Sequence, residues 1–185
     1  MTKMTISLLL GIFFLSSIVP YLAPAAIGQH HGASPPSTII GNRKISLDFE
    51  TQPNPIKANQ DITMNIGFID ENAKKNVNHV TFRMGISKDG NRLLSEFFHS
   101  HEGKVNISFK DNNKTSSSSS YTVGANSDIL TNAWIADPGS PIIVRGGQIF
   151  SQPGTYKTII EVTTLDNDKT DLPQPVKFEF ELPVS

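Results

Sequence analysis

Short runs in which apolar and polar residues alternate constrain the fold of this chain more than any other feature. In the clearest run, Ile62, Met64, Ile66 and Phe68 alternate with polar or small residues. Successive side chains of a strand point to opposite faces, so this period is typical of a half-buried β-strand. Similar runs occupy 45–50, 80–86, 92–98, 105–109, 156–162 and 176–182. No amphipathic run of helical length interrupts them, so we expect an all-β domain.

Turn-forming residues separate the alternating runs. Asp89-Gly90 is a strong hairpin signal, and Gln152-Pro153-Gly154 precedes the penultimate run. Many short strands joined by such turns favour two packed antiparallel sheets. We therefore predict a β-sandwich of about seven to eight strands.

The first 28 residues have the pattern of a targeting segment. MTKMTISLLLGIFFLSSIVPYLAPAAIG has one early lysine, an apolar run and then small residues. This is the pattern of a secretory signal peptide, with Ala23-Pro24-Ala25 as the best cleavage site. If it is not cleaved, the same stretch would be an N-terminal membrane anchor helix, although its prolines disfavour one straight helix. Either way we expect an extracytoplasmic protein, secreted or anchored, whose only contact with a membrane is this segment. Two N-x-[ST] sequons fit that location, at Asn106 and Asn113.

Three parts follow from these patterns. Residues 1–28 are the signal peptide or anchor, and the Pro- and Ser-rich stretch 29–42 is a flexible linker. Residues 43–185 form the sandwich, with an irregular insertion at 110–150 that contains the serine run Ser116–Ser120.

Composition excludes several classes of protein. The chain has no cysteine, which rules out disulfides, thiolate metal sites and blue-copper centres. Its net charge of -1 gives no basic face for nucleic acid. The sequence also lacks the G-x-S-x-G, H-E-x-x-H, P-loop and S-x-x-K signatures of enzymes. We therefore expect that the protein is not an enzyme.

The stretch FFHSHEG, 97–103, is the best candidate for a metal site. His99 and His101 are two residues apart, so on a strand their rings share one face and can hold one ion. Glu102 is a third ligand or an acceptor for a ring N–H in this hypothesis. The alternative is a polar strand end that leads into a turn at Gly103.

His79 is the possible third histidine. In a hairpin closed by Asp89-Gly90, Lys88 faces Asn91, so paired positions sum to 179. His79 then lies beside Ser100 and diagonal to the other two histidines, while a bulge would shift this pairing by one.

Other residues with ligand chemistry have simpler roles. Met64 and Met84 are in phase with the apolar sets and should pack in the core. His30 and His31 could chelate copper only if the mature chain began at Gly28, and the residue before that cut, Ile27, is not small. Trp134 either is buried or marks a contact surface.

The pattern from about Phe49 onward resembles small exported Ig-like domains of the YtkA, FixH and CopC-like type. The stretches that carry this resemblance are PNPIKANQDITMNIGFID, NVNHVTFRMGISKDGNRL and QPGTYKTIIEV. HSHEG and AWIADPGSPIIVRGGQIF are similar to exported archaeal proteins. Tyr156, after Pro-Gly-x, is at a position that resembles a tyrosine corner. The resemblance implies an Ig-like sandwich and a setting where copper handling is common, but it carries over no metal ligand, because the spacing of His30 and His31 does not match.

Two functions fit these observations. The first is a non-enzymatic exported binding or accessory module of the cell envelope, with copper binding or delivery through His79, His99 and His101 to an envelope protein partner. The alternative is a structural or adhesive surface domain without metal, in which 110–150 meets a protein partner. Converging histidine rings would favour the first, and an exposed apolar patch around Trp134 the second.

Overall fold

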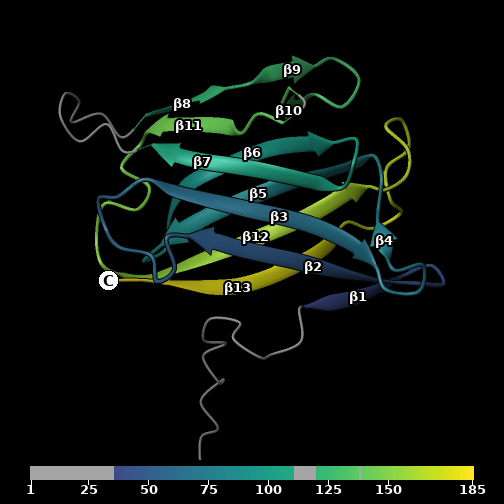
Figure 1. Cartoon of the computed structure of the whole chain (residues 1–185), viewed down its shortest axis with the longest axis horizontal. Coiled ribbons are helices and arrows are strands. Elements are labelled where there is room, and N and C mark those ends of the chain that lie inside the picture. Colours follow the sequence, from purple (N-terminus) through teal and green to yellow (C-terminus); the bar gives the residue numbers. More distant parts are fainter. Residues whose placement is uncertain (1–35, 111–119, 138) are drawn as a thin grey trace, which may run out of the picture.

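The fold of the chain is all-β, with two sheets packed face to face in a sandwich-like arrangement (Figure 1). A computed structural model describes residues 36–110, 120–137 and 139–185. The predicted leader, His30, His31, Asn113 and most of the serine run lie outside these residues. Within the described ranges there is no helix, and hence none that has the length and apolarity to cross a membrane.

Each sheet is built from strands that come from both halves of the chain. The first sheet has the order β1-β2-β3-β7-β11-β8, with β4 paired to β3. Its strands are β1 (Ser37–Ile40), β2 (Arg43–Gln52), β3 (Ile62–Asp70), β4 (Lys75–Asn76), β7 (Lys104–Lys110), β8 (Tyr121–Gly124) and β11 (Ile142–Gly146). The second sheet has the order β13-β12-β5-β6-β10-β9. Its strands are β5 (Val80–Lys88), β6 (Asn91–Ser100), β9 (Asn126–Asp128), β10 (Ala133–Ile135), β12 (Gly154–Thr164) and β13 (Val176–Val184).

The long alternating runs all form strands, and the prediction of two sheets is confirmed. The number of strands is larger than expected, 13 in the described residues, because short stretches outside the alternating runs also pair. Strand β1 lies inside the predicted linker 29–42 and pairs with β2. Strands β8 to β11 lie inside the predicted irregular insertion 110–150.

Two strand pairs differ from the predicted antiparallel arrangement. β10 pairs with β6, and β11 pairs with β7, in parallel. The connection from β6 to β10 includes β7, β8 and β9, and the connection from β7 to β11 includes β8, β9 and β10, so both are as long as a parallel pair requires.

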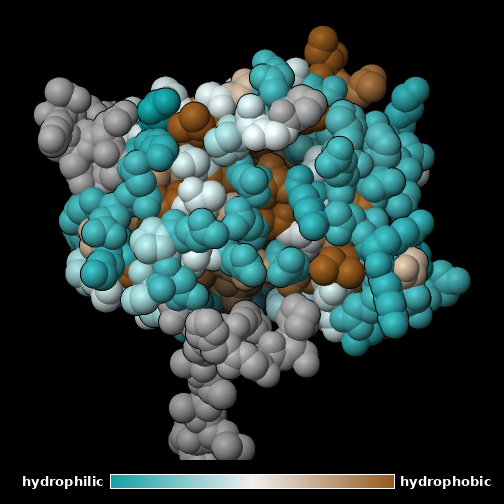
Figure 2. Space-filling view, in the orientation of Figure 1, coloured by the Kyte–Doolittle hydropathy of each residue, from teal (hydrophilic) through white to brown (hydrophobic). Residues whose placement is uncertain are grey.

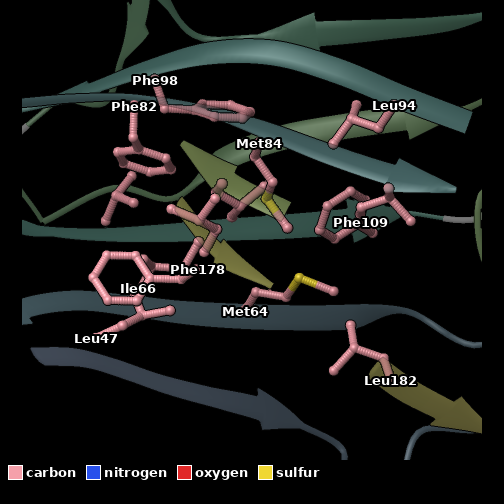
Figure 3. Close-up of a cluster of buried hydrophobic side chains, with 14 of the residues drawn as sticks. Leu47, Met64, Ile66, Phe82, Met84, Leu94, Phe98, Phe109, Phe178 and Leu182 are labelled. Carbon is pink, nitrogen blue, oxygen red and sulfur yellow. The ribbon is translucent and has the colours of Figure 1, made fainter. Parts of the chain in front are cut away.

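The core lies between the sheets and consists of the inward-facing positions of the alternating runs. Met64 and Met84 are fully buried there, as predicted (Figure 3). The other labelled members of this cluster are Leu47, Ile66, Phe82, Leu94, Phe98, Phe109, Phe178 and Leu182. The alternation therefore predicted correctly which residues face the core. The residues between them point to the outer face of each sheet, where they can form a binding site.

Most of the surface seen in Figure 2 is polar, but apolar atoms project above the edge that carries β9 and β10 (Figures 1 and 2). Ile129 and Leu130, in the turn between these strands, are 94% and 66% exposed. This turn borders the outer face of the second sheet.

Candidate metal centre

The three histidines meet at the open end of the β5–β6 hairpin, at the right of Figure 1. The turn at Asp89-Gly90 has two positive φ angles and pairs Lys88 with Asn91, as predicted. A bulge next to Ser87 then shifts the register by one residue.

That shift corrects the predicted neighbour of His79. Ser100 pairs with Val80, not with His79. His79 lies one step further out, where its backbone N–H donates to the carbonyl of His101 at 3.1 Å. The bulge therefore places His79 directly opposite His101, which is a closer arrangement than the predicted diagonal.

The glycine of the HSHEG stretch has a steric role in this arrangement. Gly103 has a φ of +69° and lies so close to Val77 that a Cβ would fall 1.9 Å from the Val77 carbonyl oxygen. Only glycine permits this approach without displacement of the backbone. The turn after His101 is thus held against the segment that leads into His79.

A fourth side chain, that of Asp168, completes the cluster. One ligand atom from each of His79, His99, His101 and Asp168 lies within 4.8 Å of the other three. The His99 Nε2 atom is 3.2 Å from His101 Nδ1, and His101 Nδ1 is 3.4 Å from His79 Nδ1. Asp168 Oδ1 lies 2.9 Å from His79 Nδ1 and 3.4 Å from His99 Nε2.

The loop between β12 and β13 brings Asp168 to the histidines. The Asp166 N–H donates to the carbonyl of Asn78, the residue before His79, at 2.9 Å. The Asp166 carboxylate also accepts from Arg43. These contacts hold the backbone of the loop two residues before Asp168. The position of the Asp168 carboxylate is therefore set by the loop as well as by the side-chain torsions of Asp168.

His99 is the buried member of the cluster and has the best-defined ring orientation. Its Nδ1 atom is 2.9 Å from the Thr81 hydroxyl on the neighbouring strand. A partner on Nδ1 leaves Nε2 as the atom directed at the other three groups, which is how outer partners orient histidine ligands. Burial lowers the pKa of His99, against the opposing effect of the Asp168 charge. A lowered pKa keeps the ring neutral, the form that binds metal.

The spacing of the four atoms fits a metal ion. Bonds of about 2.0–2.1 Å to a tetrahedral ion set its ligand atoms about 3.3 Å apart. Four of the six separations in the cluster range from 2.9 to 3.4 Å, and all six lie within 4.8 Å. Three imidazoles and one carboxylate form a donor set that suits zinc or copper(II).

Sequence reasoning selected His79, His99 and His101, which the structure brings together, but it missed Asp168. That residue lies in LDNDKTDLPQP, where several acids in a polar loop give no sign of which one turns inward. Glu102, proposed as a ligand or acceptor, is exposed in the turn and is not one of the four. Trp134 is half-buried, and its indole N–H donates to Glu96.

Comparison of the sequence with protein-family models and with curated proteins finds no match in either set. The site is therefore interpreted from its own geometry.

Proposed function

We propose that this chain is a non-enzymatic, exported metal-binding module of the cell envelope. The observation that carries the proposal is the convergence of three imidazoles and one carboxylate at the separations of a metal coordination shell. A neutral imidazole offers the lone pair of its unprotonated nitrogen and a carboxylate offers its negative charge, so a divalent cation at this point can be held by all four groups.

Copper(II) is the ion we propose. Imidazole binds both copper(II) and zinc, and for one set of ligands copper(II) binds more tightly in the Irving–Williams order. Copper(I) prefers sulfur, but the chain has no cysteine, and both methionines of the described residues are buried in the core. A delivery role would follow from export and from the partial exposure of His79 and His101, through which an envelope partner could reach the ion.

Titration of the purified full-length chain with copper(II) and with zinc tests this proposal. We expect one equivalent to bind, with copper tighter than zinc, and the His99→Ala/His101→Ala variant to lose that binding. A His30→Ala/His31→Ala variant is the matched control, and it should bind copper as the wild type does, because these two histidines could chelate copper only in a chain that began at Gly28. Equal binding by the wild type and the His99→Ala/His101→Ala variant would refute the proposal.

We also propose that the sandwich is Ig-like. Tyr156, near the start of β12, donates its hydroxyl hydrogen to the carbonyl of Gln152 at 2.8 Å. A bond from such a tyrosine to the backbone a few residues upstream is the mark of a tyrosine corner. The pattern of residues 1–28 supports export, either with a cleaved signal peptide or with an N-terminal anchor.

A second function, a surface domain that binds a protein partner without metal, is favoured by one observation. Ile129 and Leu130 are exposed in the segment 110–150, where the alternative interpretation requires a partner contact. They are close in sequence to Trp134, although Trp134 itself packs against the core. Absence of metal binding in the titration would leave this as the leading function.

A further inference from the structure

A cleft adjoins the histidine cluster on the outer face of the second sheet. Its volume is about 500 Å³, within the range of small-molecule sites. Thr81, Phe97 and Thr163 from strands β5, β6 and β12 are among its lining residues. The β9–β10 turn and the β12–β13 loop contribute most of the remaining lining, which includes Leu130, Asn132, Asp168, Lys169, Asp171 and Leu172.

The cleft and the candidate metal centre share two residues. Thr81 holds the ring of His99, and Asp168 supplies the carboxylate of the cluster. His99 is buried, so an ion at the centre would be closed on the side of the sheet. Asp168 belongs both to the cluster and to the lining of the cleft, so a ligand in the cleft meets the candidate metal centre at this carboxylate.

The cleft also carries exposed apolar surface. Among the described residues, the large hydrophobic side chains that are exposed are Ile39, Phe97, Ile129 and Leu130. Phe97 and Leu130 line the cleft, and Ile129 is the neighbour of Leu130 in the chain. Apolar surface gathered beside a polar centre is typical of a site that binds a ligand with both characters.

The polar side chains of the lining determine the charge that the ligand should have. Lys169 and Asn132 have no side-chain hydrogen bond or ion pair within the described part of the chain, so both can donate to an anion. Asp171 and Asp168 oppose an anion, while a divalent ion and the Lys169 ammonium together offset these two charges. An anionic group that coordinates the ion is therefore accommodated only when the metal is bound.

We propose that the cleft binds a small organic acid, with its carboxylate on the metal ion and its apolar end on Phe97 and Leu130. This inference rests on the proposed metal site and adds a ternary complex of protein, ion and organic acid. Copper(II) accepts such an additional oxygen ligand, because its tetragonal geometry takes oxygen donors beside nitrogen donors.

The test uses the copper-loaded full-length chain and 3-phenylpropionate as the probe. Visible absorption and electron paramagnetic resonance of the copper report directly on a new ligand. We expect 3-phenylpropionate to change both spectra and to bind about 10-fold more tightly than acetate, because its phenyl group leaves water. Benzyl alcohol, which has the ring without the carboxylate, should leave the spectra unchanged.

Two variants locate the binding. Phe97→Ser and Leu130→Ser should each reduce the advantage of 3-phenylpropionate over acetate at unchanged copper affinity. Ile39→Ser, an exposed apolar residue on β1, is the matched control and should have no effect. Equal affinity for the two acids, or full retention of the advantage in both cleft variants, would overturn the inference while the metal site stands. Failure of the chain to load copper would overturn both, and the metal titration detects that outcome first.

Discussion

Two polar clusters share strand β6, and they differ in how their hydrogen bonds are matched. The Glu96 carboxylate accepts from the Tyr121 hydroxyl at 2.7 Å and from the Trp134 indole N–H at 2.9 Å. Each oxygen has one donor, and the bonds join β6 to β8 of the other sheet and to β10. Three residues along, His99 begins the cluster with His79, His101 and Asp168, in which each ring nitrogen donates or accepts according to its tautomer.

This contrast separates a structural polar group from a candidate ligand. Glu96 pairs with the core residue Met84, and His99 pairs with Thr81, so their side chains point to opposite faces of the sheet. A half-buried acceptor with its own donors, as in the Glu96 cluster, stabilises the fold. Three ring nitrogens and a carboxylate within 4.8 Å of one another have no fixed donor in their contacts, and a divalent cation can be bound by all four at once.

The largest expected effect on stability comes from breaking the Glu96 cluster. Glu96→Ala leaves the tyrosine hydroxyl and the indole N–H without their acceptor, and should lower the free energy of unfolding by about 2–4 kcal/mol. Urea denaturation in the presence of a chelator measures this change. Copper affinity should stay within about two-fold of the wild type, because the two clusters share no side chain.

The exposed Glu102 supplies the control for that prediction. Glu102→Ala removes the same type of side chain from the turn after His101 and should change neither quantity. A copper affinity that fell in Glu96→Ala as far as in a histidine variant would show that the two clusters are not independent.

Asp168→Asn should have the opposite effect to Glu96→Ala, with a large change in copper affinity and a small change in stability. Loss of a charged ligand should weaken copper binding by at least about 10-fold. The free energy of unfolding of the metal-free chain should fall by less than about 1 kcal/mol, since the pair of Asp168 with His79 is partly exposed. Copper titration and chelator-treated urea denaturation separate these quantities. Asp171→Asn, on the same loop but outside the cluster, should keep the affinity of the wild type.

Most of the fold and three of the four cluster residues could be predicted from the sequence. Alternation and the Asp89-Gly90 turn are local signals, and they located the hairpin on which all three histidines lie. The bulge near Ser87 could not be predicted, because the Asp89-Gly90 turn determines only the pairing of the residues next to it. Asp168 is 89 residues from His79, and its position depends on contacts of the β12–β13 loop that no local pattern encodes.

Arg43 should act on the cluster from a distance. It ties β2 to the loop of Asp168, since its side chain contacts both Asp70, at 2.7 Å, and Asp166. Arg43→Met should therefore weaken copper binding by about three- to ten-fold, as loss of an outer support for a ligand does. Arg43→Lys should restore part of this affinity, because it keeps the charge but not the two-sided contact. Unchanged affinity in Arg43→Met would show that the loop holds Asp168 without the ion pair.

The smallest expected effect concerns pH, and it arises from the burial of His99. Burial lowers its pKa in the folded chain below the value of 6.5 that an unperturbed histidine has. Between these two values the unfolded chain binds more protons, so the stability of the metal-free protein is fully present above about pH 6.5 and falls as the pH drops below it. The slope from one such group is at most about 1.4 kcal/mol per pH unit.

Urea denaturation in the presence of a chelator, at several pH values between 7.5 and 5, measures this loss of stability. His99→Gln should flatten the profile in this window. Glu161, whose pKa is lowered chiefly by a hydrogen bond from Arg83, contributes stability that is lost only at lower pH, as its carboxylate protonates. A wild-type profile that is already flat from pH 7.5 to 5 would contradict the role assigned to burial. A profile that falls equally in His99→Gln would assign the loss to another group, and the contrast with the Glu96 cluster would then rest on metal affinity alone.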